Sequence, residues 1–177
     1  MGQSKNGEIR SMKILVTGGA GYIGSTLVPE LLNAGHEVCV YDSLLFGGNS
    51  MFPHFKNKNF SMIVGDIRDT EKLKEVVIGK DVVIHLAAIV GYPACEKDHQ
   101  VTKDVNLKAT KALVDMLDEN QVILFGSTGS NYGKVEGVCT EESPLNPLSL
   151  YGETKTEAEQ YIMSNSKAVA YRFATAF

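Results

Sequence analysis

A glycine-rich stretch, residues 12–25 (MKILVTGGAGYIGS), constrains the fold of this chain more than any other part of the sequence. An apolar run over residues 14–16 predicts a buried strand, and Gly18, Gly21 and Gly24 follow it at intervals of three. A helical pattern of apolar residues begins directly afterwards. The N-terminus of a helix presents unpaired N–H groups, and glycines let phosphate oxygens approach the backbone. We therefore expect this turn to bind a diphosphate rather than to be a glycine-rich turn of another kind.

Two acidic residues follow at the places that a dinucleotide site requires. Residues 37–41 predict a second strand, which ends at Asp42, about 20 residues beyond the glycines. A carboxylate there accepts hydrogen bonds from both ribose hydroxyls and repels a 2′-phosphate, so Asp42 favours NAD over NADP. The alternative is an Asp that only caps a turn. Asp66, just past a third strand, is the candidate for binding the adenine amino group.

Strand-like and helix-like segments alternate along the rest of the chain. The expected strands are residues 14–16, 37–41, 60–64, 81–86, 121–125 and 168–172, and the expected helices are residues 22–33, 70–77, 98–119 and 150–164. This alternation predicts a doubly wound parallel α/β sheet of the Rossmann type, with helices on both faces. We expect one NAD-binding domain over residues 12–177, preceded by a flexible tail at residues 1–11.

Composition narrows the class of protein. A net charge of −4 argues against a general affinity for nucleic acid or an anionic membrane, and no apolar run is long enough to span a bilayer. The three cysteines, Cys39, Cys95 and Cys139, lie far apart in the sequence. They form neither a disulfide framework nor a metal-ligand cluster, so we expect no metal and a reducing, cytoplasmic location.

A tyrosine and a lysine lie four residues apart on the expected helix 150–164. Tyr151 and Lys155 therefore share one face of that helix. A tyrosine has a pKa of about 10, and a nearby ammonium lowers that pKa and makes the phenol a better acid/base near neutral pH. An exposed helix face is the usual explanation for such a pair. Here, however, the pair follows a glycine turn and the Ser127-Thr128 dipeptide, an order that favours catalysis.

These motifs, taken in order, resemble the extended short-chain dehydrogenases/reductases, and within them the NAD-dependent epimerase/dehydratase family that acts on nucleotide sugars. The matching stretches are TGGAGYIGS (17–25), YDS (41–43), GDIRD (65–69), HLAA (85–88), VN (105–106), GSTGSNYG (126–133) and YGETK (151–155). The resemblance implies an enzyme with NAD as cofactor and a nucleotide sugar as substrate.

The resemblance also implies a role for individual residues. Tyr151 would be the catalytic acid/base, Lys155 its partner, and Thr128 a hydrogen-bond partner of the reacting oxygen. Asn106 would support the lysine through the helix and a water, although an exposed polar position is its simpler interpretation. The positions at which the family contacts NAD are Gly18, Gly21, Tyr22, Ile23, Asp42, Asp66, Ile67, Ala87, Tyr151 and Lys155.

The implied chemistry is that of a UDP-glucose 4-epimerase, with hydride transfer through a 4-keto sugar. The family's 4,6-dehydratases carry an Asp-Glu pair where this chain has Gly129 and Ser130, which disfavours dehydration. A dehydratase or reductase of the same family remains an alternative, as does a short NAD-binding module without catalysis. Family members continue well beyond the position of Phe177 into a substrate-binding lobe, so we expect this chain to bind NAD with little turnover.

The resemblance further implies a homodimer. In the family, the helices that correspond to residues 98–119 and 150–164 pair across a two-fold axis.

Overall fold

The computed structural model describes residues 10–174, which form two compact units divided between Leu86 and Ala87. Both units are parallel α/β structures, and together they contain six strands. The expected doubly wound α/β class is therefore confirmed. Most of the expected tail, residues 1–9, lies outside the described residues. Over the described range, no helix combines the length and apolar character needed to cross a bilayer.

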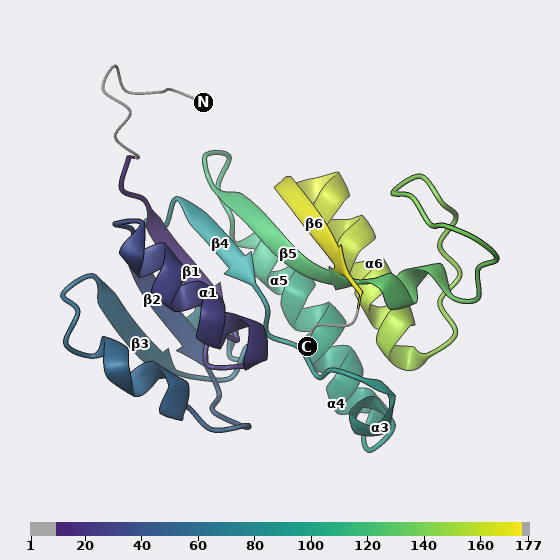
Figure 1. Ribbon diagram of the computed structural model, residues 1–177, viewed down its shortest axis with the longest axis horizontal. Helices are drawn as coiled ribbons and strands as arrows, with labels where there is room; N and C mark the ends of the chain where they lie inside the picture. Colours follow the sequence, from purple (N-terminus) through teal and green to yellow (C-terminus); the bar gives the residue numbers. More distant parts are fainter. Residues whose placement is uncertain (1–9, 175–177) are drawn as a thin grey trace. The chain divides into compact units, whose positions relative to one another are not determined.

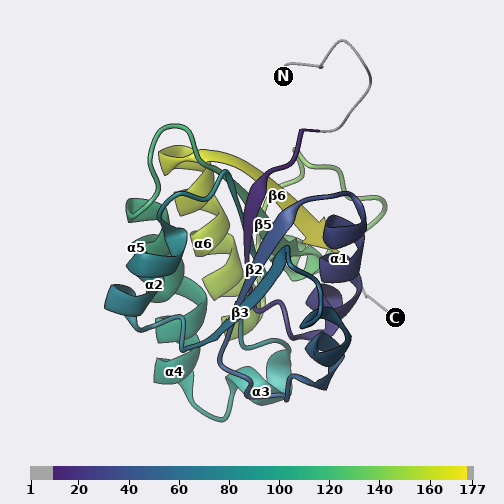
Figure 2. The same ribbon diagram turned by 90° about the vertical axis from the view of Figure 1, so that its left-hand side faces the viewer.

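The first unit contains four parallel strands. Strand β1 (Lys13–Thr17) lies between β2 (Glu37–Asp42) and β4 (Val82–His85), and β3 (Phe60–Val64) pairs with β2 (Figure 1). Helices α1 (Tyr22–Asn33) and α2 (Thr70–Val77) cover opposite faces of these strands (Figure 2). Because both faces are covered, β1 and β2 are apolar runs without polar alternation.

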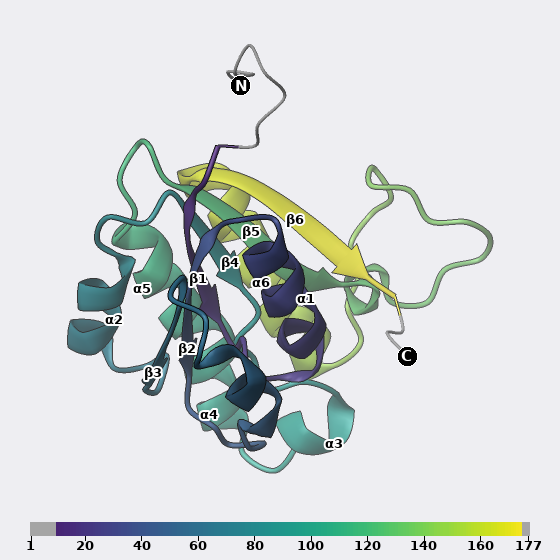
Figure 3. The same ribbon diagram turned by 60° about the vertical axis from the view of Figure 1, so that its left-hand side comes forward.

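The second unit contains two parallel strands. Strands β5 (Val122–Thr128) and β6 (Lys167–Phe173) pair along their whole length (Figure 3). Helix α6 (Leu150–Asn165) packs against both of them and against α5 (Ala109–Asp115). Strand β6 alternates between half-buried and exposed residues, because α6 covers only one of its faces.

Five short elements complete the described chain. They are η1 (Asn49–His54), α3 (Tyr92–Cys95), α4 (His99–Lys103), η2 (Asp104–Lys108) and η3 (Gly129–Tyr132). All six expected strands and the expected helices at 22–33, 70–77 and 150–164 are confirmed, with shifts of three residues or fewer at their ends.

The expected single helix over residues 98–119 is wrong in detail. The segment is helical from α4 to α5, but its middle part, η2, has the wider π-helical hydrogen bonding, and α5 ends at Asp115. Asn106 lies in this wider turn and turns its side chain to the backbone of Ile89. Single π-turns inside helices are frequent at functional sites, and periodicity of apolar residues does not reveal them.

Candidate functional site

In the first unit, the glycine turn leaves the N-terminus of α1 open. Gly21 is the N-cap, no side chain caps the helix, and its first turn holds no acidic residue. Gly18 has a φ of 71°, and its carbonyl accepts a hydrogen bond from the Gly21 N–H at 3.1 Å. A Cβ on Gly24 would lie 2.2 Å from the Gly19 carbonyl oxygen, so only glycine lets α1 approach the turn this closely. No side chain therefore occupies the N-terminus of α1, the arrangement in which helix N–H groups bind an anion.

Asp42 stands at the end of β2 and is tied to this glycine turn. Its Oδ2 accepts a hydrogen bond from the Ala20 N–H at 3.0 Å, and its Oδ1 accepts one from the Leu44 N–H at 2.8 Å. Each carboxylate oxygen keeps a further lone pair for another donor. The N–H groups at the start of α1 fit the diphosphate of NAD, and the Asp42 carboxylate fits the hydroxyls of its adenosine ribose.

Asp66 and its neighbours lie just past β3. The Asp66 carboxylate binds the Arg68 guanidinium at 2.6 Å, and this hydrogen bond lowers the pKa of Asp66. The backbone carbonyl oxygen of Asp66 accepts a hydrogen bond from the Tyr41 hydroxyl at 2.8 Å. Burial, with Asp69 and Asp66 nearby, raises the pKa of Tyr41 to about 12, so this phenol stays neutral and keeps its proton to donate. Tyr41 is a supporting residue that sequence reasoning missed.

The remaining first-unit residues differ in exposure. Tyr22 is 66% exposed, Ile23 is half-buried and Ile67 is buried. Tyr22 and Ile23 belong to the first turn of α1, beside the open N–H groups. The structure thus groups Gly18, Gly21, Tyr22, Ile23 and Asp42 around one end of one helix.

In the second unit, Asn106 is a buried anchor and not an exposed polar position. It is 1% exposed, and its side-chain amide binds the N–H and the carbonyl of Ile89 at 2.8 and 2.9 Å. Its Nδ2 also lies 3.5 Å from the hydroxyl of Thr154 on α6. Asn106 therefore fastens the segment after Ala87 to the helix that carries Tyr151 and Lys155.

Tyr151 lies beside Thr128 in the second unit. The Thr128 side chain lies beside the Tyr151 hydroxyl and acts to lower its pKa, and Thr128 is the last residue of β5. Burial raises the pKa of Tyr151, with a further contribution from Cys95, and outweighs the lowering effect of Thr128. In the protein alone, the pKa of this phenol therefore shifts in the direction opposite to the one that the expected role as an acid/base needs.

Lys155 is the most deeply buried charged side chain of the expected set. It is 2% exposed, and its Nζ lies 3.9 Å from the centroid of the Phe125 ring. Burial lowers the pKa of Lys155 to about 7, although Glu159 opposes the shift. The amine therefore changes its charge near neutral pH.

The structure adds two residues beside Lys155 that sequence reasoning missed. Phe125 supplies the ring beneath Lys155, and Glu159 lies one helical turn beyond Lys155 on α6. Glu159 could have been found from the sequence, since residues 151, 155 and 159 continue one four-residue spacing along α6. Nothing in the sequence marks Phe125, which resembles any other core residue.

A pH-dependent contribution to stability follows from the lowered pKa of Lys155. Between pH 7 and 10 the unfolded chain holds a proton at Lys155 that the folded chain lacks, so the free energy of unfolding rises with pH. We expect the free energy of unfolding of the wild type, relative to Lys155→Met, to increase by about 1 kcal/mol per pH unit between pH 7.5 and 9.5. Urea unfolding at several pH values measures this difference.

The matched control is Lys108→Met, because the Lys108 side chain is 67% exposed. The difference in the free energy of unfolding between Lys108→Met and the wild type should not change between pH 7.5 and 9.5. A flat difference for Lys155→Met would show that Lys155 titrates normally and would contradict the burial described here.

Comparison with known sequences identifies relatives that act on nucleotide sugars. The chain is 34% identical over 167 residues to a UDP-glucose 4-epimerase of Lactobacillus helveticus, which covers 92% of this chain and 49% of the relative. It is 32% identical over 159 residues to a dTDP-glucose 4,6-dehydratase of Streptomyces niveus, covering 84% of this chain and 47% of the relative. The chain thus spans about half the length of the curated relatives that it matches.

Comparison with solved structures identifies relatives of the same kind. The UDP-glucuronic acid 4-epimerase of Bacillus cereus in complex with NAD superposes with a TM-score of 0.85 at 32% identity, over 93% of this chain and 56% of that one. The sequence profile described as "NAD dependent epimerase/dehydratase family" matches residues 14–176. The family is one of NAD-dependent enzymes, which confirms the expected enzyme class and cofactor. This chain belongs to the NAD-dependent epimerase/dehydratase family.

Proposed function

We propose that the chain is the cofactor-binding part of a nucleotide-sugar 4-epimerase and that Tyr151 is its acid/base. The observation that carries this proposal is the position of Tyr151 beside Thr128, the last residue of β5, with Lys155 buried one turn away on the same helix. The Tyr151 phenol can pass a proton to or from a hydroxyl of a bound sugar that lies between it and Thr128. Thr128 then orients that sugar hydroxyl.

The first unit supports the binding of NAD. The open N-terminus of α1 suits the diphosphate, and Asp42 suits the ribose hydroxyls. Asp66 and Ile67 are the candidates for the adenine, and Ala87 for a position close to the nicotinamide half. When bound, NAD supplies a hydride acceptor for the sugar carbon.

The charge of Lys155 decides whether Tyr151 can act as a base. Burial alone raises the pKa of Tyr151, whereas an ammonium close to the phenol stabilises the phenolate and lowers that pKa. Because the pKa of Lys155 is about 7, the ammonium is present below neutral pH and is lost above it. Any nearby anion that keeps the lysine protonated therefore favours the phenolate.

Epimerisation is favoured over dehydration by residues of η3. Gly129 and Ser130 follow Thr128 and carry no carboxyl group that could eliminate water. A dehydratase or reductase remains the alternative, and dehydratases are among the relatives. An NAD-binding module without a reaction of its own is the other alternative. Product analysis by NMR with a panel of nucleotide sugars distinguishes these three outcomes.

We propose in addition that the protein is a cytoplasmic homodimer in which α5 and α6 pair with their copies. These helices already share polar contacts at their surface, such as the ion pair of Lys111 with Glu157 at 2.7 Å. Light scattering at rising protein concentration tests the dimer, and a strict monomer would remove this part of the proposal.

The choice between NAD and NADP tests the role of Asp42. We expect isothermal titration calorimetry to show NAD binding with NADP bound at least about tenfold more weakly, because the carboxylate repels a 2′-phosphate. Asp42→Asn removes that repulsion and should narrow the gap between the two cofactors.

Asp81→Asn is the matched control for this experiment. Asp81 also accepts a backbone hydrogen bond at the end of a strand, from the Lys13 N–H at 2.7 Å, but Lys13 begins β1, at the end opposite the glycine turn. Asp81→Asn should leave the ratio of the affinities for NAD and NADP unchanged. Equal binding of both cofactors by the wild type would contradict the role of Asp42.

The catalytic role of Tyr151 is tested by removing one oxygen. In a protein that contains these residues and converts a nucleotide sugar, Tyr151→Phe should lower kcat by about 10²–10⁴-fold, because the proton acceptor is lost. Tyr161→Phe is the control, since Tyr161 lies on the same helix and its hydroxyl donates to Asp115. If both variants keep wild-type activity, the assigned chemistry is wrong.

A further inference from the structure

Glu159 is a buried carboxylate that the proposed chemistry does not use. It follows Tyr151 and Lys155 at the same four-residue spacing on α6 and is 5% exposed. A buried charge is costly unless it is paired and hydrogen-bonded. The partners of Glu159 therefore indicate what its burial achieves.

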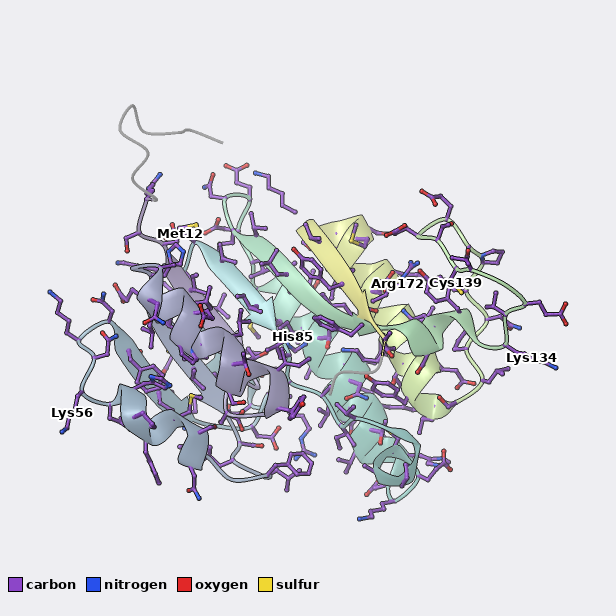
Figure 4. The ribbon with its side chains drawn as sticks, in the orientation of Figure 1. Met12, Lys56, His85, Lys134, Cys139 and Arg172 are labelled. Atoms are coloured by element: carbon purple, nitrogen blue, oxygen red, sulfur yellow. The ribbon has the colours of Figure 1, made fainter. Side chains whose placement is uncertain are left out.

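Both oxygens of Glu159 are bound. The Arg172 guanidinium donates to Oε1 from Nη2 at 2.6 Å and from Nε at 2.9 Å. The Ser127 hydroxyl donates to Oε2, and the Asn131 amide donates to the same oxygen at 2.9 Å. Figure 4 marks Arg172 towards the C-terminal end of β6. One carboxylate on α6 thus joins β5, η3 and β6.

These partners lie directly beside the residue that meets Tyr151. Ser127 precedes Thr128 in β5 and is in register with Arg172 in β6. Arg172 also donates to the Tyr132 hydroxyl at 2.9 Å and to the Glu141 carbonyl at 3.0 Å. The network thereby holds the chain on both sides of Thr128.

We propose that Glu159 is a positioning residue for the reacting pair: it binds Ser127 and Arg172 together, and so sets where Thr128 stands against Tyr151. This inference rests on the proposed function, in which Thr128 and Tyr151 handle the same hydroxyl. Three side chains of α6 then have fixed partners on β5. Tyr151 meets Thr128, Lys155 meets the Phe125 ring, and Glu159 meets Ser127.

A second consequence concerns the charge of Lys155. The negative charge of Glu159 raises the pKa of Lys155 against the effect of burial, so it keeps the ammonium in place to a higher pH. Glu159 therefore acts on both members of the reacting pair.

Other titratable groups lie on the elements that pack against α6. They are Cys95 on α3, His99 and Lys103 on α4, Asp104 and Lys108 on η2, Lys111 and Asp115 on α5, Tyr132 on η3, and Lys167, Tyr171 and Arg172 on β6. The two carboxylates in this set have partners other than Lys155. Asp104 pairs with Lys108 at 2.8 Å, and Asp115 accepts a hydrogen bond from the Tyr161 hydroxyl at 2.6 Å. Glu159 is the anion that acts on Lys155.

The experiment uses NMR titration of the 177-residue chain labelled with ¹³C at tyrosine Cζ and lysine Cε. Tyr151→Phe and Lys155→Met assign the two signals. In Glu159→Gln we expect the Lys155 midpoint to fall by about one pH unit from its value near 7, and the Tyr151 signal to move because Thr128 is displaced. Glu159→Asp keeps the charge, so the Lys155 midpoint should return towards the wild-type value.

Glu157→Gln is the matched control, because Glu157 lies on the same helix in an exposed ion pair with Lys111. If Glu159→Gln leaves both signals where this control leaves them, the inference is overturned. If Glu159→Gln does not fold, Ser127→Ala decides. It keeps the ion pair with Arg172, so it should move the Tyr151 signal and leave the Lys155 midpoint near 7.

An unchanged Tyr151 signal in Ser127→Ala would overturn the inference as well. Neither NMR signal needs a bound cofactor. A wild-type chain that fails to bind NAD would therefore refute the proposed function while this test of Glu159 still stands.

Discussion

The second unit of this protein keeps one amine out of water. Lys155 lies against the Phe125 ring, and burial brings its pKa to about 7. An exposed lysine would stay charged at every physiological pH, whereas this one responds to its surroundings. The charge that raises the pKa of Lys155 against the effect of burial comes from Glu159.

Fully bound polar groups make this burial possible. Asn106 uses its amide on both backbone groups of Ile89, and Glu159 uses both oxygens on β5, η3 and β6. Satisfied buried networks are rigid, because moving one member leaves its partners without hydrogen bonds. The helix that carries Tyr151 and Lys155 is therefore held from two sides by polar contacts as well as by its apolar face.

The first unit depends on close approach of backbone to backbone. The glycines leave the amino end of α1 without a cap, and Asp42 accepts a hydrogen bond from the turn itself. The same carboxylate also accepts a hydrogen bond from the Leu44 N–H, so Asp42 joins the end of β2 to the glycine turn.

Sequence reasoning predicted most elements because both the strand pattern and the helix pattern are local. It placed α1, β3 and α2 at the residues where the structure has them. It failed at Asn106, where the helix widens into a π-turn to let one side chain reach Ile89. It also ended β5 at Phe125, whereas pairing with β6 extends the strand through Thr128. Both errors depend on partners distant in sequence.

The sequence alone determined the fold class, the glycine turn, the acidic residue beyond it and the Tyr151–Lys155 pair, because each depends on spacing along the chain. Only the tertiary structure decided the ionisation of the pair, since pKa depends on burial and on charges brought close by folding. It also decided the role of Glu159, whose partners Ser127 and Arg172 lie 32 and 13 residues away. Spacing fixes which side chains share a face, and packing fixes what that face meets.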